Sequence, residues 1–220
     1  MELGESDVMW AYSVPCPDGG IQHYNPDRAR VVTSTFTIVA TDGIDWGVAV
    51  ASRVLAVGGI VPALESLVGA VATQATVNVA WKSEALRLLR ANEPAQSVVQ
   101  KLVAEDVAPE GRQVAVVDRE GRVAAYPGPG CRRWAGHHEG SGFAIAGNIL
   151  SGPQVIAAMA DSFTAQTGAL ALRRVTSLSA GDHVGGDARG RQSAAIMVAR
   201  SHGGEGTPVT GPGCMWLSGW

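Results

Sequence analysis

Cysteine and aromatic residues are scarce in this chain of 220 residues, and long apolar runs are missing. The three cysteines, Cys16, Cys131 and Cys214, lie far apart and include no C-x-x-C pair, so we expect neither a disulfide framework nor a metal site. No stretch approaches the roughly 20 apolar residues of a membrane span. The first 20 residues also lack the basic and apolar regions of a secretory signal. These absences predict a soluble cytoplasmic protein with no membrane partner and no metal.

An excess of positive charge is also missing. Lys and Arg together number 17 against 20 Asp and Glu, which gives a formal net charge of −3, so we expect no nucleic-acid partner. The G-K-[ST] ending of a nucleotide-binding P-loop and the G-x-S-x-G turn of α/β-hydrolases are absent as well. The hydrophobic share of 46% is typical of a globular protein, and the length suits one domain with one substantial core. We also expect no cofactor.

Hydrophobic periodicity divides the middle of the chain into strands and helices. Residues 1–32 and 201–220 are rich in glycine and proline and lack a sustained period, so we expect an irregular extension and an irregular tail around a domain over 33–200. The pattern predicts hairpins over 34–53 and 112–127, strands over 68–76, 142–147 and 191–200, and helices from about 80, from about 95, after 151–153 and over about 168–179.

This order of elements favours one fold class. The strands come in antiparallel groups and the helices in pairs, so the alternation of strand and crossover helix that builds a Rossmann fold is missing. We therefore expect an α+β protein with the four-layer αββα arrangement, in which two antiparallel sheets face each other and a helix layer covers each outer face.

The hairpin over 34–53 contains the first candidate site residues. Side chains alternate along a strand, so Ala49 and Ala51 share a face with Arg53. Thr35 on the preceding strand is expected opposite Arg53 or nearly so, which would bring a hydroxyl within reach of a guanidinium. The alternative interpretation is ordinary, because threonine is a common strand residue and a single arginine is usually solvated at an edge.

Polar residues near two further turns are also candidates. Asn148 lies between a glycine and a predicted helix start, where its amide can either donate to an oxyanion or cap the helix. In the loop "GGDARG" the glycine amides can cradle an anion, and Asp187 can pair with Arg189.

A metal site is the least favoured candidate. His137, His138 and Glu139 are adjacent, but neighbouring side chains point to opposite faces of a strand and the H-E-x-x-H spacing is absent. A metal-dependent hydrolase built on these three residues would need bound zinc or iron.

Ordered blocks of the sequence resemble a known family. The blocks are "STFTIVATD", "VGAVATQATVN", "RQVAVVDREGRVAAYPG", "CRRWAGH", "GFAIAGNILSGPQVIAAM" and "GGDARGRQSAA". In this order they resemble the bacterial family called domain of unknown function 1028, whose fold is that of the N-terminal nucleophile (Ntn) hydrolases. The resemblance covers about residues 33–200. It implies the αββα fold and hydrolysis of an amide bond in a small-molecule or peptide-like substrate.

The resemblance also implies roles for single residues. Thr35, the threonine before the first aromatic residue, aligns with the nucleophile, whose own α-amine would act as the base at a pKa near 8. Arg53 would lower the pKa of that amine. Further residues would orient the substrate or form an oxyanion hole, and these are Asn148, Gln74, Asn78, Asp187 and Arg189. By analogy with such folds we expect a homo-oligomer.

The chain departs from the family pattern because 34 residues precede Thr35. The segment is expected to be a propeptide removed between Ser34 and Thr35, or to lie before a true start at Val31 or Val32. A start at Val32 would expose Thr33 as the alternative nucleophile. If the segment is retained, we expect a catalytically silent protein that binds a small ligand or a partner.

Overall fold

The computed structural model describes residues 14–15, 21–22 and 32–200, which form an α+β structure with antiparallel sheets. The α+β class expected from the sequence is therefore confirmed. Contacts group the chain into two units, Met1–Val31 and Val32–Trp220. In the first unit, β1 (Val14–Pro15) pairs with β2 (Ile21–Gln22) within the segment expected to be irregular. The predicted tail over 201–220 lies outside the described residues.

One five-stranded sheet, here called the β4 sheet, is built around the first predicted hairpin. Its strands, in spatial order, are β10 (Gly136–Gly140), β11 (Phe143–Asn148), β4 (Thr35–Thr41), β5 (Asp45–Ser52) and β12 (Ser193–Arg200). The β4–β5 turn is closed by the Asp42 carboxylate, which accepts hydrogen bonds from the amides of Ile44 and Asp45 at 3.0 and 2.8 Å. Gly43 has φ 84° there, a value that glycine adopts without strain.

The other five-stranded sheet, here called the β7 sheet, contains the second predicted hairpin. It runs in the order β3 (Val32–Thr33), β7 (Gly69–Thr76), β8 (Arg112–Asp118) and β9 (Val123–Pro127), and β6 (Pro62–Glu65) also pairs with β7. A short helix, α1 (Val57–Ile60), lies between β5 and β6.

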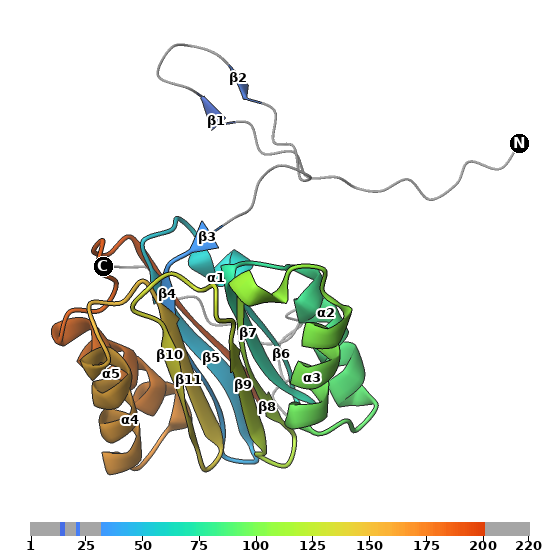
Figure 1. Cartoon of the computed structure of the whole chain (residues 1–220). Coiled ribbons are helices and arrows are strands. Elements are labelled where there is room, and N and C mark those ends of the chain that lie inside the picture. The colour runs from blue at the N-terminus through green and yellow to red at the C-terminus, as the bar shows by residue number, and fades with distance from the viewer. Residues whose placement is uncertain (1–13, 16–20, 23–31, 201–220) are drawn as a thin grey trace, which may run out of the picture. The chain divides into compact units, whose positions relative to one another are not determined.

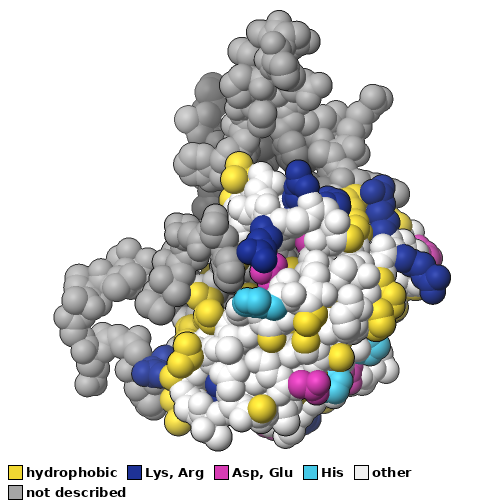
Figure 2. All heavy atoms as spheres, turned by 90° about the vertical axis from the view of Figure 1, so that its left-hand side faces the viewer, with side chains coloured by type: hydrophobic (Ala, Val, Ile, Leu, Met, Phe, Trp, Pro, Cys, Tyr) yellow, Lys and Arg dark blue, Asp and Glu magenta, His cyan; other side chains and the backbone are white. Residues whose placement is uncertain are grey.

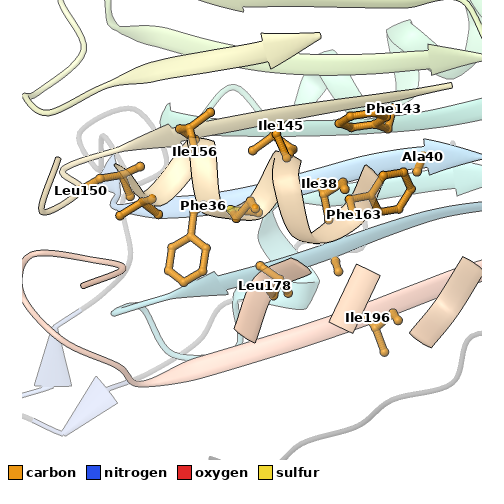
Figure 3. Close-up of a cluster of buried hydrophobic side chains, with 14 of the residues drawn as sticks. Phe36, Ile38, Ala40, Phe143, Ile145, Leu150, Ile156, Phe163, Leu178 and Ile196 are labelled. Atoms are coloured by element: carbon orange, nitrogen blue, oxygen red, sulfur yellow. The ribbon is translucent and has the colours of Figure 1, made fainter. Parts of the chain in front are cut away.

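Apolar side chains join the sheets and helices through three clusters. One lies between the β4 sheet and the helices α4 (Gln154–Ala165) and α5 (Leu170–His183) and includes Phe36, Ile145 and Phe163 (Figure 3). The second fills the space between the two sheets. The third packs the outer face of the β7 sheet against α2 (Ala80–Arg90) and α3 (Ala95–Glu105). The sheets thus face each other with a helix pair outside each (Figure 1).

The elements that sequence periodicity missed have weak patterns. The strand β10 reads Gly-His-His-Glu-Gly and is largely exposed, β6 begins with Pro62, and α1 contains two glycines in four residues. Such short or polar segments give no usable period. No helix in the described part of the chain is long and apolar enough to cross a membrane.

Candidate functional site

The chain passes from one sheet to the other at Ser34. Thr33 in β3 pairs with Ala75 of the β7 sheet, whereas Thr35 in β4 lies between Ser52 and Asn148 of the β4 sheet. Thr33 and Thr35 therefore belong to strands in different sheets.

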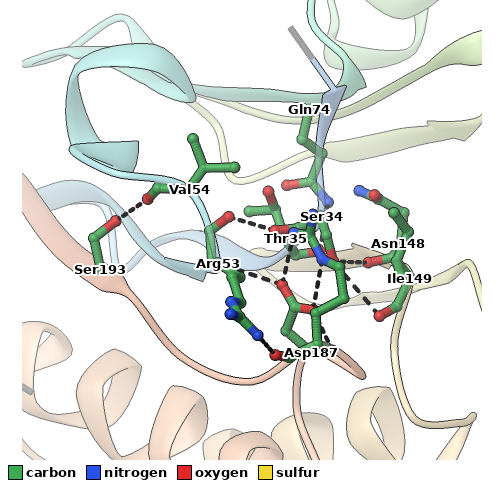
Figure 4. A network of polar contacts seen from close by, with 11 residues as sticks. Ser34, Thr35, Arg53, Val54, Gln74, Asn148, Ile149, Asp187 and Ser193 are labelled. Carbon is green, nitrogen blue, oxygen red and sulfur yellow. Dashed lines mark hydrogen bonds and ion pairs between the residues drawn. The ribbon is translucent and has the colours of Figure 1, made fainter. Parts of the chain in front are cut away.

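The buried peptide at this crossing is held by hydroxyl groups (Figure 4). The Ser52 hydroxyl donates a hydrogen bond to the Ser34 carbonyl oxygen. The Ser34 hydroxyl in turn donates to the carbonyl oxygens of Asn148 at 3.2 Å and Ile149 at 3.5 Å. The carbonyl that precedes Thr35 therefore already has a side-chain donor placed on its oxygen.

Three amide side chains form a buried network beside the start of β4. The Gln113 Oε1 accepts hydrogen bonds from Gln74 Nε2 at 2.7 Å and Asn148 Nδ2 at 3.1 Å. Gln74 Nε2 also lies 3.4 Å from the Thr35 carbonyl oxygen, and Gln74 Oε1 accepts from the Thr37 hydroxyl at 3.0 Å. The network bridges the two sheets and fixes the orientation of each amide.

The Thr35 hydroxyl has no hydrogen-bond partner, although the residue is 0% exposed. The same holds for Thr33. A buried hydroxyl without a partner costs roughly 1–3 kcal/mol, and most buried polar groups in proteins are paired. An unpaired hydroxyl next to a network of fixed amides is a candidate reactive group.

Backbone strain is found on both sides of Ser34. Ala75, the pairing partner of Thr33, has φ 64°, and Ile149, whose carbonyl accepts from the Ser34 hydroxyl, has φ 53°. Residues other than glycine seldom adopt this left-handed conformation, and a β-branched isoleucine does so at a clear cost. Strain of this kind is often found at functional sites.

The predicted pairing of Thr35 with Arg53 is wrong. Thr35 is in register with Ser52, so it shares a face of the sheet with Ser52 and not with Arg53. The Arg53 guanidinium donates to the Arg189 carbonyl oxygen, and the Arg53 amide donates to Asp187 Oδ2 at 3.0 Å. A shift of one residue in the register therefore turns the arginine away from the threonine hydroxyl.

The loop that leads into β12 closes this end of the β4 sheet. Asp187 is 5% exposed and pairs with Arg189 at 3.1 Å, and a bridge to Leu150 joins the loop to the segment after β11. Most basic side chains on the face formed by α4 and α5 lie toward the end where β4 begins (Figures 1 and 2). Arg191, in the same loop, pairs with Asp182 at 2.8 Å.

A cavity of about 200 Å³ lies between this end of the β4 sheet and α5. Its walls come from β4, β5, β12, α5 and the loop before β12. Ser52, whose hydroxyl donates to the Ser34 carbonyl oxygen, and Asp187, which accepts from the Arg53 amide, are among the lining residues. The remaining walls are mostly apolar and include Phe36, Leu178 and Ile196.

Comparisons with known proteins place the chain in a family. The model of a family of unknown function, DUF1028, matches residues 35–210. The chain belongs to the DUF1028 family. A crystal structure of another member, protein SPO2555 from Silicibacter pomeroyi, is similar with a TM-score of 0.71 and 30% identity over 76% of this chain and 74% of that one. No curated protein sequence matches the chain significantly. The DUF1028 match begins at Thr35, the first residue of β4.

Asn78, one of the predicted site residues, has its hydrogen-bond partners outside the polar cluster at Ser34. Asn78 Nδ2 donates to Asp106 Oδ2 at 2.8 Å, and its Oδ1 accepts from the Ala80 amide at the start of α2. Burial opposes ionisation of Asp106, but hydrogen bonds from Asn78, the Ala108 amide and Arg112 outweigh it and hold the pKa below its usual value. Asn78 thus has a structural role.

The histidines of β10 form no metal centre. The described residues of the DUF1028 chain contain no group of three or more His, Cys, Asp or Glu side chains that could hold a metal ion. Glu139 accepts a hydrogen bond from the Ala125 amide at 2.7 Å, and His138 stacks on Phe143.

Sequence reasoning missed Ser52 and Gln113. Gln113 lies on the same face of β8 as Ala115 and Val117, which pack between the sheets. A glutamine at an inward position of an alternating strand was the available signal. Nothing in the sequence set Ser52 apart, because its role depends on the register of β4 and β5.

Proposed function

We propose that this DUF1028 protein is an N-terminal nucleophile amidohydrolase, with Thr35 as the nucleophile once residues 1–34 have been removed. The observation that carries the proposal is the buried, unpaired Thr35 hydroxyl beside a peptide bond whose carbonyl is already held by Ser52. The family match that begins at Thr35 supports the same boundary. On this proposal the two sheets and two helix pairs are the four-layer αββα sandwich of the Ntn hydrolases.

Removal of the extension would use the same hydroxyl. The Thr35 Oγ attacks the Ser34 carbonyl carbon, negative charge develops on the Ser34 oxygen, and the Ser52 hydroxyl stabilises it. As the C–N bond breaks, the hydroxyl proton passes to the Thr35 nitrogen, which leaves an ester between Ser34 and Thr35 Oγ. Water then hydrolyses the ester, which releases residues 1–34 with a carboxylate at Ser34 and gives Thr35 a free amine.

Hydrolysis of a substrate amide would follow the same path. The free amine, with a pKa near 8, takes the proton of the Thr35 hydroxyl as the oxygen attacks the substrate carbonyl carbon, and the proton then goes to the leaving amine. Gln113 fixes Asn148, so the second amide hydrogen of Asn148 is oriented without further ordering. Both amide hydrogens of Gln74 are used, on Gln113 and on the Thr35 carbonyl oxygen. The acyl-enzyme ester is finally hydrolysed by water.

Intact-mass analysis and N-terminal sequencing of the full-length protein test the proposal. We expect a mature chain that begins at Thr35, and we expect Thr35→Ala to retain all 220 residues and to lose hydrolysis of a panel of small amides. Thr33→Ala is the matched control, because Thr33 is equally buried and unpaired but lies in the other sheet. A chain that stays uncut while Thr35→Ala leaves amide hydrolysis unchanged would show the proposal to be wrong.

The second candidate function is a catalytically silent protein that binds a small ligand. It is favoured by the position of Arg53, whose side chain contacts the Arg189 carbonyl and not Thr35. Among the contacts of residues 32–200, no basic side chain bonds to the Thr35 hydroxyl. Turnover of any amide that depends on Thr35 would exclude this candidate.

A further inference from the structure

We infer that the site of the cut chain, which begins at Thr35, binds the acyl side of its substrate as an extended peptide. The substrates are then peptides that are cut after a small hydroxylated residue such as serine. The inference rests on the proposed hydrolase function and names the substrate class of the same site. It follows from the contacts that Val32, Thr33 and Ser34 make in the uncut chain.

The residues before Thr35 occupy the acyl position of the proposed reaction. When the extension is removed, the Ser34 acyl group moves from the Thr35 nitrogen to Thr35 Oγ, the hydroxyl proton passes to that nitrogen, and water releases the acyl group as a carboxylate. When a substrate is hydrolysed, its acyl group is bonded to the same oxygen, its amine leaves with the proton, and water again releases a carboxylate. The two esters differ only in the acyl group, so the contacts of Ser34 and its neighbours indicate what the site accepts.

Val32 and Thr33 are bound as an edge strand of the β7 sheet. They form β3, which pairs antiparallel with Thr76 and Ala75 of β7, and they belong to the second of the two contact units. The opposite edge of β7 pairs with β8 as far as Ala75, so β3 lies on the edge that β6 pairs with at residues 69–72. Release of the extension removes β3, and the backbone of Ala75 and Thr76 then offers its hydrogen-bonding groups to a new strand. An extended peptide can bind there by strand addition.

Ser34 lies in a closed polar subsite (Figure 4). It is 0% exposed, and its hydroxyl donates hydrogen bonds to the carbonyl oxygens of Asn148 at 3.2 Å and Ile149 at 3.5 Å. The enclosure leaves little room for a larger side chain, and the two carbonyl oxygens favour a side chain with a donor. The residue that carries the scissile carbonyl is therefore expected to be serine, whereas alanine fits but leaves the two acceptors without this donor.

Thr33 occupies a second closed subsite, which differs in its chemistry. The residue is 0% exposed and its hydroxyl has no hydrogen-bond partner. Valine has the same branched shape and brings no buried hydroxyl that lacks a partner, so it should be accepted there at least as well as threonine. The two subsites should therefore respond differently to the loss of a hydroxyl group.

The test uses the wild-type protein after it has lost residues 1–34 and been separated from them, as intact mass verifies, because cleavage clears Ser34 from the site. The substrates are coumarinyl amides of acetylated Ser, Thr-Ser and Val-Thr-Ser, and hydrolysis is followed by fluorescence. Of the two neighbouring residue pairs between β3 and β7, one exchanges both backbone hydrogen bonds. At about fivefold for each bond, kcat/KM should be about 25 times higher for Val-Thr-Ser than for Ser. Free Val-Thr-Ser, which is the end of the released segment, should inhibit competitively.

Two matched peptides, each lacking one hydroxyl, test the two subsites. Val-Thr-Ala lacks the hydroxyl that bonds to Asn148 and Ile149, so its kcat/KM should be lower by about fivefold or more. Val-Val-Ser lacks the hydroxyl that has no partner and should be hydrolysed at least as well as Val-Thr-Ser. Val-Thr-Leu should be the poorest substrate, because its last side chain does not fit the Ser34 subsite.

The outcomes separate the inference from the proposed function. A protein that retains residues 1–34 would overturn both together, since the β7 edge then stays covered. A cut protein that hydrolyses amides, with kcat/KM equal for Ser and Val-Thr-Ser or highest for Val-Thr-Leu, would overturn the inference alone. If the cut protein hydrolyses no amide, calorimetric titration with the free peptides decides. Tighter binding of Val-Thr-Ser and Val-Val-Ser than of Val-Thr-Ala and Val-Thr-Leu upholds the subsites, and equal binding or none overturns them.

Discussion

Replacement of Gln113 by methionine should destabilise the protein strongly. Gln113 is 0% exposed and its amide makes four hydrogen bonds. Its oxygen accepts from Gln74 and Asn148, and its nitrogen donates to the carbonyls of Gly147 at 2.9 Å and Gly136 at 3.2 Å. Methionine has a similar length and shape but can form none of these bonds, so the change removes the polar network with little change in packing.

The expected size of the effect follows from those four bonds. At about 1 kcal/mol for each buried hydrogen bond, the free energy of unfolding should fall by roughly 4 kcal/mol. This is a large part of the roughly 5–15 kcal/mol that stabilises a typical domain. For a chain of this size the melting temperature should fall by roughly 8–16 °C.

Urea denaturation followed by circular dichroism measures the change, with Gln100→Met as the control. Gln100 lies on the exposed side of α3, and the same substitution there should change stability by less than about 0.5 kcal/mol. A loss below about 1 kcal/mol in Gln113→Met would refute the reasoning, because it would mean that the groups around Gln113 find other partners. If the network also positions the catalytic amides, the folded Gln113→Met protein should release residues 1–34 more slowly than the wild type.

Two further predictions concern the packing of α5 and the effect of acid. A Cβ on Gly47 would lie 2.1 Å from Nη1 of the buried Arg174, whose pKa burial lowers to about 10. Gly47→Ala should therefore lower the free energy of unfolding by about 1–3 kcal/mol. A double-mutant cycle in urea should show that this cost vanishes in the Arg174→Ala background, whereas additive losses would contradict the contact. Hydrogen bonds from Arg200 lower the pKa of Asp45 in the folded protein. Their contribution to the free energy of unfolding is therefore complete above the pKa of aspartate in the unfolded chain, near 3.9, and is lost as the pH falls through the lower pKa of the folded protein. Urea midpoints measured from pH 7 downwards should accordingly fall less for Asp45→Asn than for the wild type, and parallel curves would speak against this pair.

The sequence predicted most of the secondary structure because the elements with strong periods are the buried ones. Residues 34–53 form the β4–β5 hairpin. The apolar positions that follow a helical period after Pro153 are all buried, and these are Val155, Ile156, Met159, Ala160 and Phe163. The strand β10 and the short helix α1 were missed because polar residues and glycines leave no period to detect. The predicted limits of the elements were close to the observed ones, although α5 ends at His183 and not near 179.

The candidate site was only partly within reach of the sequence. Thr35 and Asn148 were candidates from the residue pattern, and Gln74 was added from the family resemblance. The structure brings the three together around Gln113. The sequence also placed Arg53 opposite Thr35, which failed because a shift of one residue in a hairpin moves a side chain to the other face. Local patterns cannot fix the register to that accuracy.

The amino-acid sequence by itself determined the α+β class, the order of the strands and helices and the family, because each depends on periodicity and on ordered blocks along the chain. Only the tertiary structure decided that the chain changes sheets at Ser34 and that Ser52 holds the carbonyl before Thr35. These contacts join residues that are far apart in the chain, 18 positions for Ser34 with Ser52 and 114 positions for Ser34 with Asn148. Contacts over such separations depend on how strands pair and layers pack, which no local pattern specifies.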